Sequence, residues 1–246
     1  MNRAACGVAC SGLTGPGVAI CALLLVCAAG CATSGVTGTP AKNTRLARVA
    51  FAVFDVETTG LDPKADRIVE IGAVTFRNGR VTGSRSWLIN PGVPVPRSAV
   101  RVHGITTDMV KDRPGFAAVF PEFRKFVGDA VLLAHNARYD ISFVDAEIAR
   151  CGAGAPPNAV VNTLPLFRQW FPLASRHTLA FMVEYLGLKP DAMHRGGSDA
   201  MTLYQVFKAG VATQASQLTL EDVVKMAGGE LHFSNHSPAG SSPVRE

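Results

Sequence analysis

Asp55 and Glu57 stand two residues apart at the end of a run, Val49–Phe54, that is apolar at every position. Alternate residues of a β-strand project from the same face, so we expect both carboxylates to point together from one end of a buried strand. Burying paired carboxylates is costly unless a proton or cation compensates their charge, and a hard divalent cation such as Mg²⁺ takes oxygen ligands. A strand that simply runs into a polar loop gives the same pattern, so the interpretation depends on the rest of the chain.

Two further acids stand where a helix should face the interior. Asp140 shares one helical stripe with Phe143 and Val144, because residues three and four apart are neighbours on a helix. Asp199 lies one turn before Leu203 on the same face of another helix. Each has a structural alternative: a buried salt bridge for Asp140, and a favourable place in the first turn of a helix for Asp199.

A histidine completes the group. His194 precedes Asp199 across the flexible stretch Arg195-Gly196-Gly197-Ser198 and fits a general base, since its pKa lies near working pH. Taken alone, His194 is equally well a surface loop residue. Four carboxylates around two Mg²⁺ ions form a clamp for in-line phosphoryl displacement, in which one ion activates water and the other stabilises the leaving oxygen. The five residues together predict that chemistry.

The elements that must position these residues are strands first and then alternating helices and strands. The pair Asn78-Gly79 predicts a tight hairpin, and the wholly apolar Ala130–Ala134 predicts a short buried strand. This order predicts an α/β fold with a mixed sheet flanked by helices. The expected meander strands are Val49–Val56, Ile68–Arg77 and Val81–Ile89, and the expected helices are Gly115–Gly128, Ala137–Cys151, Leu164–Phe171, His177–Leu186 and Ser198–Ala212.

The N-terminal residues 1–31 have the pattern of an export signal. Arg3 is followed by the apolar segment Val18–Ala29, which is too short for a comfortable membrane span. Ala28-Ala29-Gly30-Cys31 then resembles a bacterial lipobox, with Ala where Leu or Val is usual, and predicts lipidation of Cys31 and anchoring in the cell envelope. The alternative is a mis-assigned start before a cytoplasmic protein. Residues 32–45 have the composition of a flexible linker.

The main domain is expected over residues 46–212, followed by a short helix and a disordered tail over residues 213–246. Thr219 predicts a helix N-cap, and Gly228–Glu246 is rich in Gly, Ser and Pro. Gln217-Leu218-Thr219-Leu220 loosely resembles a sliding-clamp-binding peptide but lacks its terminal aromatic residue. We therefore favour the helix cap at this segment.

Charge and cysteine content restrict the protein class only weakly. The formal net charge is +5, but the first 50 residues contain four bases and no acid, so the remainder is almost neutral. A nucleic-acid partner therefore cannot be argued from net charge. Cys151 is the single cysteine beyond residue 31, which excludes a disulfide scaffold.

From about Arg48 to Gly210 the sequence resembles the DnaQ-like, DEDDh-type 3′–5′ exonucleases, a family that includes the proofreading epsilon subunit of bacterial DNA polymerase III. The motifs that carry the resemblance are Phe54–Leu61 continuing into Asp66–Val74, then Val102–Thr106, Ala134–Asp140, and His194 with Asp199. The resemblance implies an RNase H-like fold with a five-stranded mixed sheet and the metals over its centre.

The resemblance also implies roles for individual residues. The metal ligands for two Mg²⁺ or Mn²⁺ ions would be Asp55, Glu57, Asp140 and Asp199, with His194 as the base. The pocket for the 3′-terminal nucleotide would be lined by Thr58, Leu61, Ala99, His103 and Tyr139, with Leu61 as an apolar wedge against the last base. Asn162 departs from the family, which usually has Asp there, but that Asp is not a metal ligand.

The predicted function is removal of nucleoside 5′-monophosphates from the 3′ end of single-stranded DNA. The same chemistry on short RNA is the alternative, and the 2′-OH would distinguish the two. A proofreading subunit of a DNA polymerase would need a partner segment. A non-catalytic nucleic-acid-binding module would be expected to lose a ligand, whereas all five positions are present.

Overall fold

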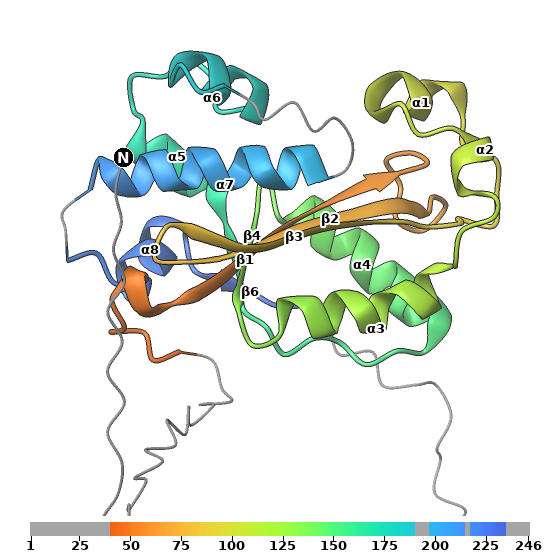
Figure 1. The fold of residues 1–246 in the computed structure, drawn as a ribbon, viewed down its shortest axis with the longest axis horizontal. Helices are drawn as coiled ribbons and strands as arrows, with labels where there is room; N and C mark the ends of the chain where they lie inside the picture. Colours follow the sequence, from red (N-terminus) through yellow and green to blue (C-terminus); the bar gives the residue numbers. More distant parts are fainter. Residues whose placement is uncertain (1–39, 190–196, 215–216, 235–246) are drawn as a thin grey trace, which may run out of the picture. The chain divides into compact units, whose positions relative to one another are not determined.

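The sheet that carries the expected site has six strands, in the order β3-β2-β1-β4-β5-β6. The computed structural model describes residues 40–189, 197–214 and 217–234, and all of these belong to one structural unit (Figure 1). Across these described ranges, every helix is too short or too polar to cross a membrane.

The first three strands form the expected antiparallel meander. They are β1 (Ala50–Thr58), β2 (Ile68–Arg77) and β3 (Arg80–Leu88). Asn78 and Gly79 between β2 and β3 have φ angles of 50° and 64°, as a two-residue turn matched to strand twist requires. The Asn-Gly hairpin prediction is therefore confirmed.

The other half of the sheet is mixed. β4 (Val131–Ala134) runs parallel to β1, and β5 (Val160–Asn162) runs parallel to β4. β6 (Glu230–Leu231) then pairs antiparallel with β5. The expected mixed α/β sheet is confirmed, but the expected number of five strands is wrong, because β6 covers the edge that β5 would otherwise expose.

The expectation of disorder from Gly228 onward is wrong for residues 228–234. Besides forming β6, this stretch places Phe233 in the core at 5% exposure, with its ring centroid 6.1 Å from that of Phe54. Burial of the Phe233 ring stabilises the folded position of this stretch, although its composition is mostly polar. The folded unit therefore extends past Ala212.

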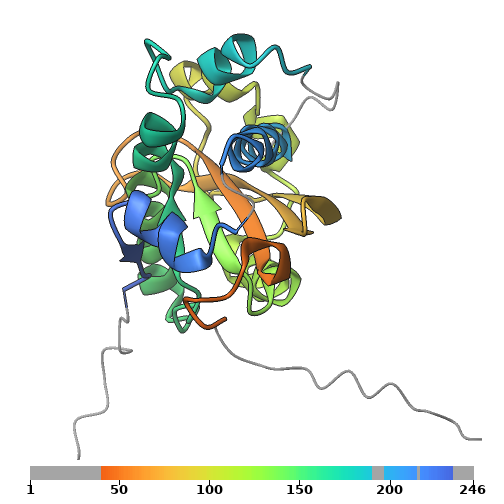
Figure 2. The same cartoon turned by 90° about the vertical axis from the view of Figure 1, so that its left-hand side faces the viewer.

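The two faces of β1 bury alternate residues in two separate cores. Phe51 and Val53 pack with α5 (Thr163–Trp170), α7 (Gly197–Ala212) and α8 (Leu220–Met226), with α6 (Leu179–Tyr185) at the margin of this core. Ala52 and Phe54 pack with α3 (Phe116–Val127) and α4 (Arg138–Cys151) on the opposite face (Figures 1 and 2). The helices expected from the sequence are confirmed to within two residues at each end.

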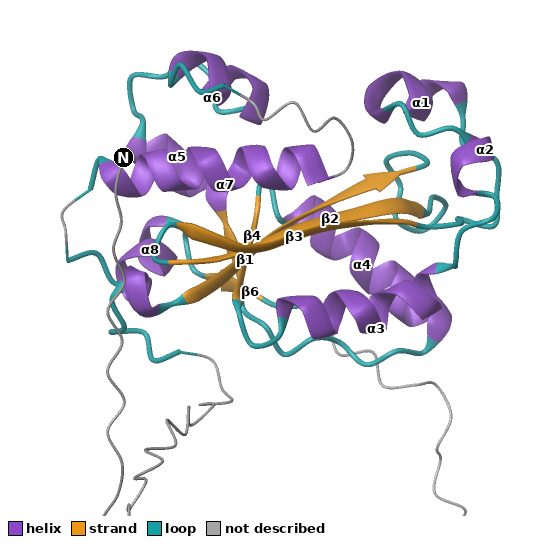
Figure 3. Cartoon of the chain, viewed as in Figure 1, coloured by secondary structure: helices purple, strands orange, loops and turns teal. Residues whose placement is uncertain are grey.

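Two short helices were not expected. The loop that contains Pro91, Pro94 and Pro96 leads into α1 (Arg97–His103) and α2 (Thr107–Val110), shown with the other helices in Figure 3. Neither is long enough to show a helical period in the sequence. Their apolar residues form a small third core with Val69 of β2, and this core holds α1 against the sheet.

The segment Gln217–Leu220, which resembles a clamp-binding peptide, leads into α8 and caps it. The Thr219 hydroxyl accepts a hydrogen bond from the Asp222 N–H at 3.3 Å, and the Asp222 carboxylate accepts one from the Thr219 N–H at 2.9 Å. This is a capping box at the start of α8. Leu220 is buried at 1% exposure. The helix-cap interpretation is confirmed.

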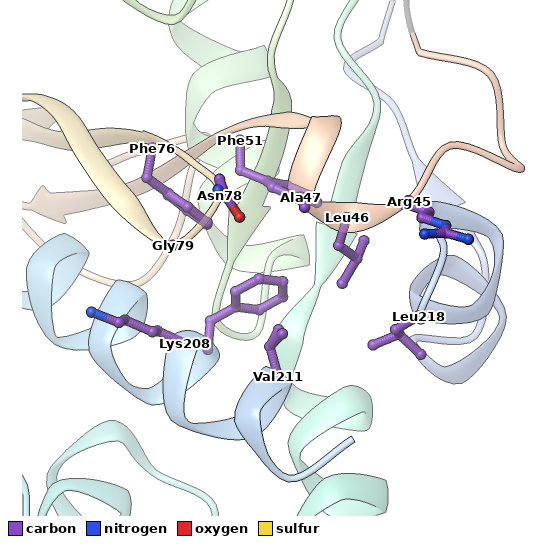
Figure 4. Close-up of a pocket in the computed structure, with 11 residues that line it drawn as sticks. Arg45, Leu46, Ala47, Phe51, Phe76, Asn78, Gly79, Lys208, Val211 and Leu218 are labelled. Atoms are coloured by element: carbon purple, nitrogen blue, oxygen red, sulfur yellow. The ribbon is translucent and has the colours of Figure 1, made fainter. Parts of the chain in front are cut away.

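A pocket of about 260 Å³ lies at the hairpin end of the sheet (Figure 4). Its lining includes the aromatic residues Phe51, Phe76 and Phe207 and the basic residues Arg45 and Lys208. It adjoins the start of β1, whereas the predicted acids of this strand stand near its end. The pocket is therefore separate from the acids.

Candidate active site

Three of the predicted acids meet where β1 ends. Asp55 and Glu57 continue the alternation of Phe51 and Val53, so their side chains face the side of the sheet that α7 covers. Asp199 enters from the first turn of α7. One carboxylate oxygen from each of Asp55, Glu57 and Asp199 lies within 4.8 Å of the others. The structure therefore brings these three residues together.

Asp140, the fourth predicted acid, approaches from the other side. It lies in the first turn of α4 and is 3% exposed. Its Oδ1 accepts a hydrogen bond of 3.2 Å from the N–H of Val56, between Asp55 and Glu57. Asp140 is outside the group of three that meets within 4.8 Å, but it is the strongest charged neighbour of Asp55.

All four acids have a pKa above its ordinary value. Burial raises the pKa of Asp55, and the charges of Asp140 and Glu57 raise it further. Burial, then Asp199 and Glu70, raise the pKa of Glu57 to about 7. Burial raises the pKa of Asp140 to about 8, although backbone hydrogen bonds oppose the shift. Asp199 keeps contact with solvent, but partial burial of its carboxylate also raises its pKa.

This arrangement suits hard divalent cations. The donors are carboxylate oxygens, which Mg²⁺ and Mn²⁺ accept readily. Neighbouring carboxylates that repel one another favour protonation, and a bound cation reverses that preference. The residues present therefore fit a divalent metal centre.

Glu70 is a fifth acid at this site, and no role was predicted for it from the sequence. It is 2% exposed and lies directly opposite Glu57 in the β1–β2 pair. The hydroxyl of Ser86 on β3 donates a hydrogen bond to it. The sequence does contain a signal for Glu70, because it is the one acid in the otherwise apolar stretch Ile68–Val74.

A small hydrogen-bonded group lies beside the acids, at the end of β1. The Thr58 hydroxyl is 2.7 Å from the Tyr139 hydroxyl and donates to the Gly60 carbonyl oxygen at 2.6 Å. The Tyr139 hydroxyl also donates to the Gly60 carbonyl oxygen, at 3.2 Å, so the two hydroxyls share one acceptor. Thr58 and Tyr139, both predicted to contact the terminal nucleotide, are thus in direct contact.

His103 connects α1 to the same place. Its Nδ1 accepts a hydrogen bond of 3.0 Å from the Ile105 N–H, so the proton is assigned to Nε2, which donates to the Thr58 carbonyl oxygen at 3.2 Å. Burial lowers the pKa of His103, which favours this neutral tautomer. A third predicted pocket residue therefore joins Thr58 and Tyr139.

Leu61 and Ala99, the other two predicted pocket residues, differ in exposure. Ala99 is a buried residue of α1, whereas Leu61 is 84% exposed. The loop that carries Leu61 is held by Asp66, whose carboxylate accepts from the Thr59 hydroxyl at 2.9 Å and from the Asp62 N–H at 3.0 Å. A Cβ at Gly60 would collide with that carboxylate, so the close approach requires glycine.

Asn162, the departure from the family pattern, caps a helix. Its Oδ1 accepts hydrogen bonds from the Leu164 N–H at 3.2 Å, at the start of α5, and from the Ala137 N–H at 3.4 Å, before α4. An amide oxygen performs this role as well as a carboxylate. His194 and Cys31 lie outside the described residues, and their roles stay predictions.

Comparison with known proteins identifies the class. The model of the exonuclease family matches residues 52–207. The epsilon subunit of DNA polymerase III from Treponema pallidum is 37% identical over 171 residues, which are 69% of this chain and 80% of that subunit. The PolC-type DNA polymerase III of Clostridium perfringens is 33% identical over 75% of this chain, but the match spans only 13% of that polymerase.

Solved structures agree with this class. Exonuclease X in complex with 5′-overhanging duplex DNA is 26% identical, with a TM-score of 0.58, over 72% of this chain and 99% of that one. Exonuclease I of E. coli with a dA16 oligonucleotide is 18% identical, with a TM-score of 0.59, over 68% of this chain and 42% of that one, and shows the fold alone. The chain belongs to the DnaQ-like exonuclease family, whose members depend on divalent metals.

Proposed function

We propose that this exonuclease removes nucleoside 5′-monophosphates from the 3′ ends of DNA and uses two Mg²⁺ or Mn²⁺ ions. Asp55, Glu57, Asp140 and Asp199 would hold the ions. The observation that carries the proposal is the convergence of the Asp55, Glu57 and Asp199 carboxylates within 4.8 Å at the end of β1. Such a centre, when bound, supplies activation of water and stabilisation of the leaving oxygen.

The chain's own groups would prepare the reaction. The Val56 N–H fixes one oxygen of Asp140 at 3.2 Å and so orients its carboxylate before any substrate arrives. His194 would accept the proton of the attacking water, because an imidazole titrates near working pH. His194 precedes Asp199, the acid in the first turn of α7, by five positions in the sequence. This short separation would let the imidazole reach the acids.

The substrate end would be held beside the metals by the pocket residues. Thr58 and Tyr139 present a hydroxyl pair at the end of β1, and His103 fixes the Thr58 carbonyl group from α1. These groups suit the sugar and hydroxyl of a 3′ terminus. Leu61, at 84% exposure, would lose its contact with water by packing against the terminal base.

DNA is favoured over RNA by the relatives. The solved exonuclease X is bound to duplex DNA with a 5′ overhang, and the epsilon relative is a subunit of a DNA polymerase. Short RNA is the competing substrate. A contact to the 2′-OH would distinguish RNA from DNA, and none of the described residues is assigned to such a contact.

The test is product analysis on 5′-labelled DNA and RNA of equal sequence. With Mg²⁺ we expect stepwise shortening of linear DNA from the 3′ end, release of nucleoside 5′-monophosphates, and no digestion after EDTA. A covalently closed single-stranded circle should resist. Asp129→Asn, at an exposed turn, is the control for Asp55→Asn. If the unaltered protein nicked the circle and Asp55→Asn did not, the protein would be an endonuclease instead.

A second candidate function is proofreading within a polymerase assembly. The names of two relatives, an epsilon subunit and a PolC-type polymerase, favour it. It would require a stable complex, so the purified chain should co-elute with the replicative polymerase of its host in gel filtration. Separate elution at micromolar concentrations would favour an exonuclease that acts without the polymerase.

A further inference from the structure

Glu70 brings a carboxylate into the interior at a place where a sheet normally avoids one. It is 2% exposed and stands directly opposite Glu57 in the antiparallel β1–β2 pair. Directly opposed residues place their Cβ atoms roughly 4.5–5.5 Å apart, and like charges in that arrangement destabilise a sheet. The position of Glu70 therefore calls for a physical explanation.

The orientation of Glu70 is fixed by the next strand. Gly72 lies opposite Ser86, and Glu70 lies opposite Leu88, so Glu70 and Ser86 are diagonal neighbours on one face. Gly72 has no side chain to separate them. The Ser86 hydroxyl donates a hydrogen bond to the Glu70 carboxylate. This contact limits the rotation of the Glu70 side chain.

The charge of Glu70 reaches both acids at the end of β1. It raises the pKa of Glu57 and, more weakly than Asp140, Glu57 and Asp199 do, that of Asp55. The same field that opposes ionisation of these carboxylates attracts a divalent cation placed between them. Because Glu70 stands directly opposite Glu57 in the β1–β2 pair, it lies beside the place where a metal would bind.

We infer that Glu70 is a positioning residue of the metal centre: its carboxylate, which stands opposite Glu57 and is oriented by Ser86, strengthens divalent cation binding. The inference rests on the proposed function, since it concerns the same ions. Glu70 is assigned no contact with substrate.

The experiment is calorimetric titration of the full chain with Mn²⁺ alone, combined with thermal unfolding in EDTA and in Mn²⁺. Glu70→Gln keeps the shape and an acceptor for Ser86 but removes the charge. We expect its Mn²⁺ affinity to fall about tenfold, as for one charge lost near a divalent ion in a solvated site. Its metal-free melting temperature should rise, because a repulsion is removed.

Two further variants complete the series. Ser86→Ala should weaken Mn²⁺ binding by a smaller factor, because the charge stays but its orientation is no longer fixed. Glu184→Gln, which removes the same charge from an exposed position on α6, should leave the affinity unchanged. A purely structural Glu70 would instead lower the melting temperature equally with and without Mn²⁺, and that result would overturn the inference.

Asp55→Asn separates the inference from the proposed function. Lost Mn²⁺ binding in Asp55→Asn, with normal affinity in Glu70→Gln, would overturn the role of Glu70 and leave the proposed function standing. Unchanged binding in Asp55→Asn would contradict both, because the centre would lie elsewhere.

Discussion

The two halves of β1 use the same face of one strand for opposite purposes. In the first half, Phe51 and Val53 are buried, and the Phe51 ring lies 5.4 Å from Phe76 and 5.5 Å from Phe207 between centroids. In the second half, acids occupy the corresponding positions and repel their neighbours. One half stabilises the fold, and the other holds charge that a cation must compensate.

The comparison teaches that stability and function are separated along a single strand. Apolar burial contributes free energy of folding without any ligand. Half-buried carboxylates oppose folding until a cation binds, because their ionised form is disfavoured. Substitutions at the two halves should therefore have different consequences, which the following predictions order by expected size.

The largest effect should come from Asp55→Asn. It removes one charge from the acid cluster and should abolish DNA digestion while the melting temperature without metal stays equal or rises. Activity assays in Mg²⁺ and thermal unfolding in EDTA measure the two quantities. Asp129→Asn, at an exposed turn, should change neither. A near-normal rate in Asp55→Asn would remove it from the set of ligands.

His194→Ala should slow hydrolysis by roughly 10²–10⁴-fold, the usual contribution of general acid–base catalysis. Mn²⁺ affinity should persist, because His194 is proposed as the base and not as a ligand. Single-turnover rates and calorimetry check both statements. Collapse of the metal affinity would show that the imidazole binds the ions.

Phe51→Ala should act on the other half of the strand. Loss of a fully buried ring typically destabilises a protein by about 3–5 kcal/mol. Chemical denaturation should show that loss, while the Mn²⁺ affinity of the remaining folded protein stays normal. Leu173→Ala, at 88% exposure, is the control and should have little effect. A selective loss of metal binding in Phe51→Ala would break the separation of the two halves.

The last prediction concerns pH and not a substitution. In the folded, metal-free chain the pKa of Glu57 is about 7 and that of Asp140 about 8, against ordinary values of 4.5 and 3.8. The folded state therefore holds more protons than the unfolded state between these limits, and stability falls as pH rises through that window. Melting temperatures in EDTA from about pH 5 to about pH 9 measure the slope.

Two controls sharpen the pH prediction. Asp140→Asn should flatten the slope, because it removes the group with the higher pKa. Added Mn²⁺ should oppose the fall, since metal ligands bind in the deprotonated form. Metal-free stability that rises with pH across the window would contradict the raised pKa values.

Much of the fold followed from local patterns. The Asn78-Gly79 turn, the apolar β4 and the amphipathic α3 each carry their signal within a few residues, so hairpin, strand and helix could be predicted. The five-strand expectation failed because β6 has two residues and depends on its pairing with β5. Short elements of this kind have no period to detect.

The sequence by itself determined the identity and order of the acids, because Asp55, Glu57, Asp140 and Asp199 stand in motifs with fixed spacing. Only the tertiary structure decided that Asp55, Glu57 and Asp199 meet within 4.8 Å and that Glu70 faces Glu57 across the sheet. The physical reason is that strand register and the position of α7 are set by packing between distant segments, which no local spacing encodes.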